Sequence, residues 1–212
     1  MMNASRRLLT LFALALFTVG ASAVAVPQST APAKSEKAKV GKPAPQFTLK
    51  DTTGTSHSLS DFRGKIVVMQ WINPDCPYCR RVVSKGVVEQ TLEELKAIDE
   101  DIVYLAVNST HYMDADDTAK YLKKHELDVP GLIDSDGTVG RLYDARTTPH
   151  MFVIDRKGVL RYSGAIDDDV RGTRGDEATN YVVKAVGLID DGKQVSPDTT
   201  RPYGCSVKYA KK

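Results

Sequence analysis

The chain has 212 residues, of which 42% are hydrophobic and 26% are charged. This length suits a single domain with a substantial core, and the composition is that of an ordinary globular protein. The formal net charge is +2, and the sequence has no basic stripe interleaved with stacking aromatic residues, which argues against a nucleic-acid-binding protein.

Residues 1–23 have the pattern of a secretory signal peptide. Arginines near the start precede the short apolar run Leu8–Val19, and an Ala-Ser-Ala tripeptide ends at Ala23. We therefore predict export to the periplasm or the extracellular space, with cleavage after Ala23; an uncleaved segment would tether the same domain to the membrane. Residues 24–39 are rich in Ala, Pro, Ser and Lys, which predicts a flexible linker.

The folded domain is predicted to span residues 40–190, followed by a C-terminal tail over residues 191–212. Phe47–Lys50 and Ser58–Ser60 have the residue types of short edge strands around a turn. The continuous apolar run Ile66–Ile72 is bounded by turn residues, which is typical of a central strand covered on both faces.

A long helix is predicted over Cys76–Ile98, with Gly86 as a weak point or kink because glycine lowers helix stability. The apolar run Ile102–Val107 predicts a second buried strand. A further helix is predicted over Asp114–Lys124, because acids early and lysines late suit the helix dipole. A short strand is expected over Leu132–Asp134.

The remaining elements are shorter. A helix is predicted over Thr138–Tyr143, and Met151–Ile154 and Val159–Tyr162 flank a turn sequence, which predicts a hairpin. Asp167–Thr179 is charged and is predicted to be a mobile surface loop, before a last helix over Asn180–Ile189. Alternating strands and helices followed by a hairpin predict an α/β fold, with a mixed central sheet and helices on both faces.

Cys76 and Cys79 form a C-x-x-C motif between the predicted central strand and the predicted long helix. The free N–H groups and partial positive charge of a helix N-terminus stabilise a thiolate, the reactive form of cysteine. Cys76 is therefore predicted to be the nucleophile, with the more exposed thiol, and Cys79 to be the shielded resolving thiol. Pro77 suits the first helical turn, and Tyr78 is expected to form an exposed contact surface. A metal site and a structural disulfide are the alternatives for this pair.

Further segments resemble a known family. They are Val40–Phe47, Gly64–Trp71, the Cys76–Cys79 motif with the dipeptide usual in glutaredoxins, and Thr147–Pro149. Together they resemble the thioredoxin superfamily, and more narrowly its exported branch of redoxins, alkyl-hydroperoxide-reductase-like proteins and membrane-tethered thiol–disulfide oxidoreductases. The resemblance covers residues 40–188 and implies a thioredoxin-like three-layer sandwich.

The resemblance also implies a substrate-binding surface. In the resembled fold, the proline that corresponds to Pro149 follows a cis peptide bond, and its loop faces the redox cysteines. The main chain of Thr148 is then implied to pair with an extended client strand. The residues implied to contact substrate are accordingly Pro77, Tyr78, Thr148 and Pro149.

Three positions depart from the patterns of the resembled proteins. Peroxiredoxins hold their reactive cysteine with a threonine three residues before it, whereas this chain has Asn73 there, which weakens a peroxidase function. Thioredoxin has a buried aspartate six residues before its first cysteine; the corresponding Gln70 can form hydrogen bonds but cannot titrate. Arg201–Tyr209 resembles the tail of a peroxiredoxin-like subgroup, so Cys205 is either an auxiliary redox thiol or a tail cysteine with no role in turnover.

The sequence favours an exported oxidoreductase that exchanges disulfides with protein clients through Cys76 and Cys79, without a cofactor. We expect a monomer that a membrane or periplasmic redox partner recycles. Two alternatives stay open: a thiol peroxidase using Cys76, with Cys79 or Cys205 resolving, and a copper or zinc module using Cys76, Cys79 and His150. For His150, a strand residue with a satisfied ring is the commoner outcome, and Asp167–Asp169 are expected to be solvated.

Overall fold

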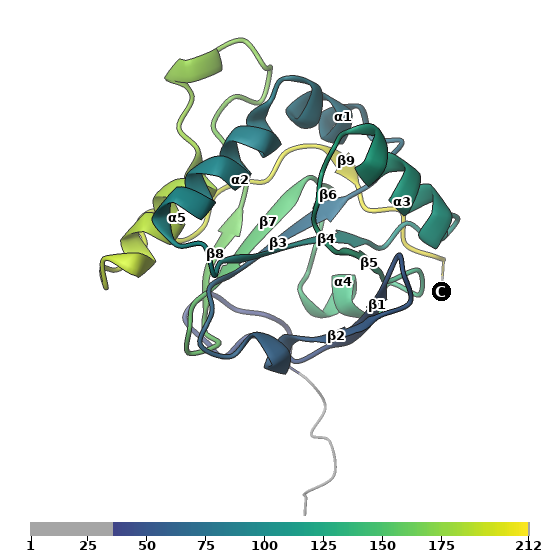
Figure 1. Cartoon of the computed structure of the whole chain (residues 1–212), viewed down its shortest axis with the longest axis horizontal. Helices are drawn as coiled ribbons and strands as arrows, with labels where there is room; N and C mark the ends of the chain where they lie inside the picture. The colour runs from purple at the N-terminus through teal and green to yellow at the C-terminus, as the bar shows by residue number, and fades with distance from the viewer. Residues whose placement is uncertain (1–35, 212) are drawn as a thin grey trace, which may run out of the picture. The chain divides into compact units, whose positions relative to one another are not determined.

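The computed structural model of the protein describes residues 36–211. Its centre is a seven-stranded sheet with the strand order β2-β1-β5-β4-β3-β7-β8 (Figure 1). The strands of this sheet are β1 (Thr48–Asp51), β2 (Ser56–Ser58), β3 (Val67–Ile72), β4 (Val103–Asn108), β5 (Gly131–Ile133), β7 (His150–Ile154) and β8 (Leu160–Gly164). A second, two-stranded sheet pairs β6 (Thr147–Thr148) with β9 (Cys205–Ser206). The predicted signal peptide and most of the predicted linker lie outside the described residues.

The main sheet is mixed, as predicted. β3, β4 and β5 run parallel, whereas β7 pairs antiparallel with β3 and β1 pairs antiparallel with β5. The prediction of an edge strand over Phe47–Lys50 is wrong, because β1 lies between β2 and the distant strand β5. The predicted strand Ser58–Ser60 ends at Ser58, and a 3-10 helix, η1 (Leu59–Phe62), follows it.

Helices cover both faces of the main sheet. In Figure 1, α1, α2, α3 and α5 lie on one face and α4 lies on the other. The helices are α1 (Pro77–Ser84), α2 (Val87–Ile98), α3 (Ala115–Lys124), α4 (Thr138–Leu142), α5 (Tyr181–Asp190) and the 3-10 helix η2 (Gly175–Glu177). The predicted long helix is divided into α1 and α2, because Gly86 takes a left-handed conformation with a φ of 75° between them.

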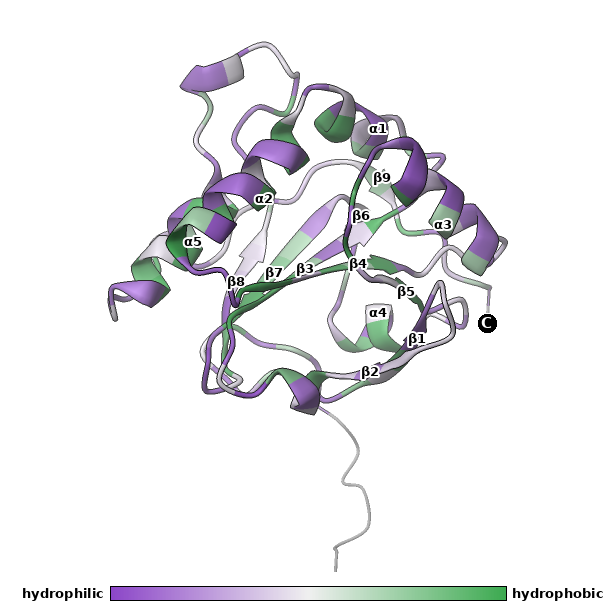
Figure 2. Ribbon diagram, in the orientation of Figure 1, coloured by the Kyte–Doolittle hydropathy of each residue, from purple (hydrophilic) through white to green (hydrophobic). Residues whose placement is uncertain are grey.

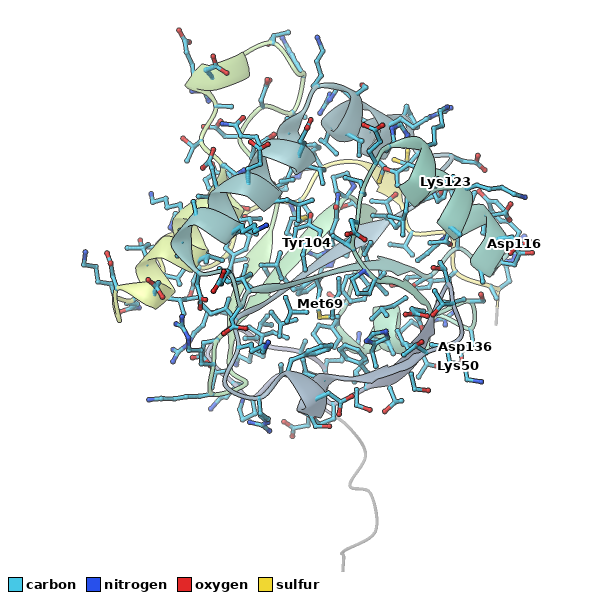
Figure 3. The ribbon with its side chains drawn as sticks, viewed as in Figure 1. Lys50, Met69, Tyr104, Asp116, Lys123 and Asp136 are labelled. Atoms are coloured by element: carbon cyan, nitrogen blue, oxygen red, sulfur yellow. The ribbon has the colours of Figure 1, made fainter. Side chains whose placement is uncertain are left out.

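The side chains of the central strand alternate between two cores. Val67, Met69 and Trp71 of β3 face the core that α4 closes, whereas Val68 faces the core beneath α2 and α5. Figure 2 shows the apolar strands at the centre and polar residues on the outer helix surfaces, and Figure 3 shows Met69 and Tyr104 on opposite sides of the sheet. Each buried side chain of this size stabilises the fold by roughly 1.5–3 kcal/mol, so β3 is a firm support for the residues that follow it.

The C-terminal tail packs onto the domain. Val195 and Tyr203 are buried in the core beneath α2 and α5, and Val207 is buried in the opposite core. Between Tyr203 and Val207, β9 pairs antiparallel with β6. The domain boundary at residue 190 stays a prediction, but residues 191–211 are part of the packed structure. Within residues 36–211, no helix combines the length and the hydropathy needed to cross a membrane.

Two buried carboxylates anchor the loop after β8, which corrects the expectation of solvated side chains for Asp167 and Asp169, whereas Asp168 is half-buried. Asp169 is 8% exposed and accepts hydrogen bonds from the N–H groups of Thr173 at 2.9 Å and Arg174 at 2.8 Å. Asp167 is 4% exposed and accepts a hydrogen bond from the Tyr203 hydroxyl. The loop is folded around these acids because buried carboxylates need donors, and one donor comes from the tail.

Candidate active site

The C-x-x-C motif lies at the carboxyl end of β3, where the chain turns into α1. Buried Asn73 shapes this turn. Its main-chain oxygen accepts a hydrogen bond from the N–H of Cys76 at 2.9 Å, and its side-chain oxygen accepts one from the N–H of Asp75 at 2.8 Å. Cys76 therefore directly precedes α1, with Pro77 as the first helical residue. This position places Cys76 at the positive end of the α1 dipole.

Both thiols of the motif are buried. The exposed fraction is 2% for Cys76 and 0% for Cys79, whereas the sequence predicted an accessible Cys76. Cys205 of the tail packs against the cluster that contains both motif cysteines, and the main-chain oxygen of Thr148 contacts the Cys76 thiol. These contacts join residues that lie far apart in the sequence, so the motif alone does not predict them.

The Thr148-Pro149 loop faces the motif, as the resemblance implied. The peptide bond between these two residues is cis. The Cys76 thiol donates a hydrogen bond to the main-chain oxygen of Thr148, with the sulfur and the oxygen 2.9 Å apart. The Thr147 hydroxyl donates to the main-chain oxygen of Pro149 at 2.8 Å, which holds the loop from within. The structure thus brings Cys76, Thr148 and Pro149 together around one point.

Cys76, Cys79 and Cys205 are free thiols, and Cys205 packs against the cluster that contains the other two. A hydrogen bond from the Cys79 thiol lowers the pKa of Cys76 to about 4, and the Cys205 thiol adds to this effect, although burial opposes it. Burial, together with the adjacent Cys76, raises the pKa of Cys79 and of Cys205. At neutral pH, the negative charge of the cluster therefore resides on Cys76. The bond to the Thr148 carbonyl belongs to the protonated form of Cys76, because a carbonyl oxygen can only accept.

Neutral groups lie beneath the motif. Gln70 is buried, and its side-chain oxygen accepts a hydrogen bond from the Tyr104 hydroxyl at 2.7 Å. Within the described part of the chain, the side-chain nitrogen of Gln70 is buried without a hydrogen-bond partner. The Tyr121 hydroxyl donates to the main-chain oxygen of Cys79 at 3.4 Å. Burial raises the pKa of both tyrosines above the usual range, so they stay protonated beside Cys79.

Tyr78 is half-buried, which corrects the expectation of an exposed contact residue. Its ring centroid lies 6.1 Å from that of Tyr203 in the tail. The Arg81 guanidinium lies 5.1 Å from the Tyr78 ring and 5.5 Å from the Tyr203 ring, and such cation–π contacts tie the tail to α1. Neither Arg81 nor Tyr203 is among the site residues predicted from the sequence; the available signal was an aromatic residue two positions before Cys205.

His150 has partners on both ring nitrogens. Its Nδ1 accepts a hydrogen bond from the N–H of Arg146 at 3.2 Å, and its Nε2 pairs with the Ser163 hydroxyl at 3.2 Å. Burial lowers the pKa of this ring to about 4, so the imidazole is neutral at pH 7. Among residues 36–211, no three His, Cys, Asp or Glu side chains are grouped so that they could hold a metal ion. The copper or zinc alternative therefore lacks its third ligand.

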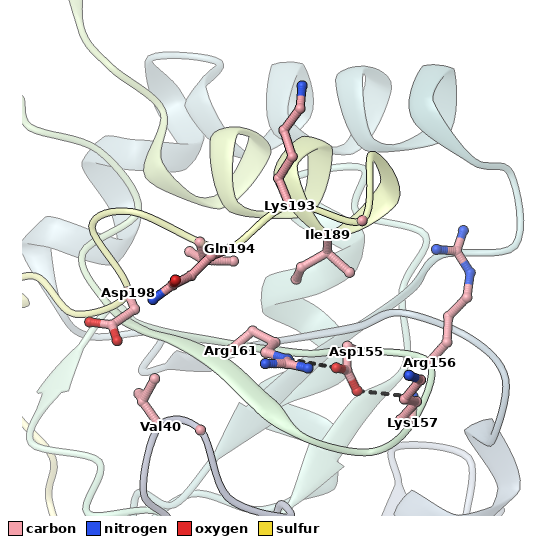
Figure 4. A pocket seen from close by; sticks show the side chains of 12 residues that line it. Val40, Asp155, Arg156, Lys157, Arg161, Ile189, Lys193, Gln194 and Asp198 are labelled. Carbon is pink, nitrogen blue, oxygen red and sulfur yellow. Dashed lines mark hydrogen bonds and ion pairs between the residues drawn. The ribbon is translucent and has the colours of Figure 1, made fainter.

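A separate surface groove of about 550 Å³ lies between the hairpin of β7 and β8 and the segment after α5. In Figure 4, Arg161 and Asp155 are joined on its floor, with 2.6 Å between the guanidinium nitrogen and the carboxylate oxygen. The residues that line this groove include neither the motif cysteines nor Pro149 nor Cys205. The redox centre is thus distinct from this groove.

Comparison with known proteins supports the redox assignment. The AhpC/TSA family matches residues 40–163. The chain is 30% identical over 132 residues to the thiol-disulfide oxidoreductase ResA of Bacillus thuringiensis subsp. konkukian, covering 59% of this chain and 69% of the relative. It is 29% identical over 147 residues to the thiol:disulfide interchange protein DsbE of Pseudomonas aeruginosa, covering 66% of this chain and 74% of the relative.

Solved structures share the fold. An uncharacterized conserved protein from Geobacillus kaustophilus superposes with a TM-score of 0.72 and 25% identity, over 82% of this chain and 94% of that protein. The family match ends at residue 163 and so does not include β9. The match over more than half of the sequence and the thioredoxin-like architecture confirm the resemblance: the chain belongs to the AhpC/TSA family, in the redoxin branch of the thioredoxin superfamily.

Proposed function

We propose that this oxidoreductase of thiols and disulfides exchanges disulfides with protein clients through Cys76 and Cys79. One observation carries the proposal: a low-pKa thiol at the start of α1 lies one helical turn from a buried, protonated thiol. A thiolate nucleophile and a shielded second thiol are the groups that two-step disulfide exchange requires. The similarity to proteins named as thiol–disulfide oxidoreductases supports the same chemistry.

The exchange would run in two balanced steps. The Cys76 thiolate attacks one sulfur of a client disulfide, forms a mixed disulfide and releases the other client sulfur as a thiolate. Cys79 then attacks the Cys76 sulfur, which breaks the mixed disulfide and forms the Cys76–Cys79 disulfide. The client leaves as a dithiol. The reverse sequence oxidises a client dithiol.

The charge on Cys76 would control when Cys79 reacts. That charge is one cause of the high pKa of Cys79, and it disappears once Cys76 is bound in the mixed disulfide. Cys79 then loses its proton more readily, at the moment when its thiolate is needed. Because Gln70 cannot accept a proton, the departing client thiolate or solvent takes it.

Pro77, Tyr78, Thr148 and Pro149 would frame the surface that an extended client contacts. Export, which depends on the N-terminal pattern, would bring the enzyme to protein disulfides, where a membrane or periplasmic redox partner would recycle it. A monomeric enzyme would present this surface directly to the client and to the redox partner.

Reduction of insulin disulfides by dithiothreitol tests the proposal. The wild-type protein should accelerate the reaction, and Cys76→Ser should lower the rate by about two orders of magnitude or more because it removes the nucleophile. Ser84→Ala, in the same helix, is the control and should match the wild type. No acceleration by the wild type, or full activity in Cys76→Ser, would contradict the proposal.

The thiol peroxidase alternative can be measured with the same proteins. Asn73 uses its side chain to hold the turn before Cys76, in the position where peroxiredoxins have a threonine. We therefore expect hydrogen peroxide to be consumed much more slowly than insulin disulfides are exchanged. Peroxide consumption that exceeds disulfide exchange and depends on Cys76 would favour the peroxidase instead.

A further inference from the structure

The C-terminal strand β9 occupies the edge where the proposed function places a client strand. Cys205 pairs with Thr148 and Ser206 pairs with Thr147, in antiparallel register. The Thr148 hydroxyl also donates a hydrogen bond to the main-chain oxygen of Cys205 at 3.5 Å. Addition of a strand to an exposed edge is a common way to bind an extended peptide, and here the peptide belongs to the same chain.

Anchors on both sides fix the position of this strand. Before it, the Tyr203 ring is 8% exposed, and its hydroxyl donates to the Asp167 carboxylate at 2.5 Å. After it, the N–H of Val207 donates to the main-chain oxygen of Arg146 at 3.1 Å, and Val207 is buried in the core. These contacts set the register in which Cys205 faces the redox motif.

Gly204 permits the close crossing of the tail over the Thr148-Pro149 loop. Its φ is 138°, a conformation that residues with a side chain rarely adopt. A Cβ atom at this position would lie 2.7 Å from the carbonyl carbon of Thr148, and closer still to its oxygen. The backbone of the tail therefore lies directly against the residue whose carbonyl accepts the Cys76 hydrogen bond.

The strand brings a third sulfur to the redox centre. Cys205 packs against the buried cluster that contains Cys76 and Cys79, and it pairs with Thr148, whose main-chain oxygen lies 2.9 Å from the Cys76 sulfur. A thiol held next to a reactive cysteine, on a strand at the client edge, has the placement of a client cysteine. Cys205 therefore differs from a cysteine in an unattached tail, because strand pairing and the anchors at Tyr203 and Val207 hold it at the redox centre.

We propose that β9 is a built-in substrate strand, and that Cys205 exchanges with the Cys76–Cys79 disulfide to form a Cys76–Cys205 disulfide. The inference rests on the proposed function, which supplies the Cys76–Cys79 disulfide from a client. In this step the Cys205 thiolate attacks the Cys76 sulfur, one disulfide breaks as the other forms, and Cys79 leaves as a thiolate. Cys79 takes up the proton that Cys205 lost, so the step needs no additional oxidant.

The exchange would fix the tail over the redox centre of the oxidised enzyme. A Cys76–Cys205 disulfide would hold β9 on β6, so a client strand would have to displace the tail and open the disulfide. In the reduced enzyme, only hydrogen bonds and packing hold the tail, and a client can compete with it. Cys205 would thereby delay reaction of the oxidised enzyme with unsuitable thiols.

Glutathione disulfide provides the direct test, with Cys79→Ser and the double variant Cys79→Ser/Cys205→Ser. In both proteins Cys76 should first acquire glutathione. In Cys79→Ser, Cys205 should then displace glutathione, leaving a monomer that is lighter by two hydrogen atoms and contains a Cys76–Cys205 disulfide. The double variant should retain the adduct. A stable adduct in Cys79→Ser, or a disulfide-linked dimer, would overturn the inference.

Glycine variants test the position of the strand in the reduced full-length protein. Gly204→Ala should push the tail away from Thr148 and raise the rate of Cys76 alkylation by about tenfold or more. Gly187→Ala is the matched control, because among the described residues nothing lies within 4 Å of the position that its new methyl group would take. Equal alkylation rates in Gly204→Ala, Gly187→Ala and the wild type would contradict the covering role of β9.

These outcomes separate the two proposals. If the wild-type protein fails to exchange insulin disulfides, the proposed function is wrong and the tail step has no disulfide to act on. If the wild type exchanges insulin disulfides while Cys79→Ser keeps its glutathione adduct, only the inference about Cys205 is wrong.

Discussion

The Cys76 sulfur lies 2.9 Å from the main-chain oxygen of Thr148, a residue 72 positions later in the chain. Thr148 also pairs with Cys205 in the two-stranded sheet. One residue therefore connects the redox motif to the strand that covers it. Cys76 is accordingly buried beside Thr148, whereas its low pKa comes first from the hydrogen bond of the Cys79 thiol.

The reduced protein should contain a thiolate at unusually low pH. Because Cys76 has a pKa of about 4, ultraviolet thiolate absorbance should titrate with a midpoint near that pH. The thiolate is the reactive form, so alkylation of Cys76 should change little with pH above this midpoint. Cys76→Ser should abolish the low-pH step in the absorbance titration. If the low-pH step persists in Cys76→Ser, the charge resides on another cysteine.

The Cys79 thiol is the largest cause of this low pKa, and paired substitutions can measure its contribution. Cys79→Ala removes the hydrogen-bond donor and should move the Cys76 midpoint upward. Cys79→Ser keeps a hydroxyl donor, so its midpoint should move less. An identical midpoint in Cys79→Ala and the wild type would show that the helix terminus and other donors stabilise the thiolate without Cys79.

The anchor at Tyr203 should contribute to both stability and the covering of Cys76. Tyr203→Phe keeps the ring but leaves the buried Asp167 carboxylate without its hydroxyl donor, which should cost about 1–3 kcal/mol of unfolding free energy. It should also raise the Cys76 alkylation rate. Tyr112→Phe is the matched control, because Tyr112 is 53% exposed and its hydroxyl lies 3.5 Å from Asp75. Equal effects of the two substitutions would argue against the anchor.

The central elements and the motif could be predicted from local sequence. The apolar run of β3 identified a buried strand, and the cysteines that follow it were expected at a helix start, where the structure has Cys76. Gly86 was recognised as a weak point, although the left-handed conformation that ends α1 depends on packing as well as on residue type. The buried strand, the position of the cysteines and the weak point at Gly86 can each be predicted from residues that are neighbours in the sequence.

The covering of the site could not be predicted in this way. The pairing of Thr148 with Cys205 joins residues that no periodic pattern connects, and Cys76, which contacts Thr148, is buried instead of accessible. Likewise, Asp167 was expected to be solvated because its sequence neighbours are charged. Its burial depends on a hydroxyl from Tyr203 in the tail, which is a tertiary contact.

Acidification should destabilise the fold through His150. Burial lowers the pKa of this ring from 6.5 to about 4, so the unfolded chain binds the proton first. Above about pH 6.5, His150 is neutral in both states and does not change the free energy of unfolding. As the pH falls toward about 4, protonation of His150 in the unfolded chain lowers the free energy of unfolding by about 3 kcal/mol. Urea unfolding at pH about 7 and about 4.5 should show a larger loss in the wild type than in His150→Gln. Equal losses would contradict this role.

In the proposed function, the Cys76 sulfur attacks the client disulfide. The variant Cys79→Ser/Cys205→Ser leaves Cys76 as the remaining cysteine of the three in the sequence. Mixed with a disulfide-containing client, it should accumulate a mixed disulfide that peptide mapping places on Cys76, while the wild-type protein releases the client as a dithiol. If this variant forms no adduct under conditions in which the wild type reduces the client, Cys76 is not the attacking thiol.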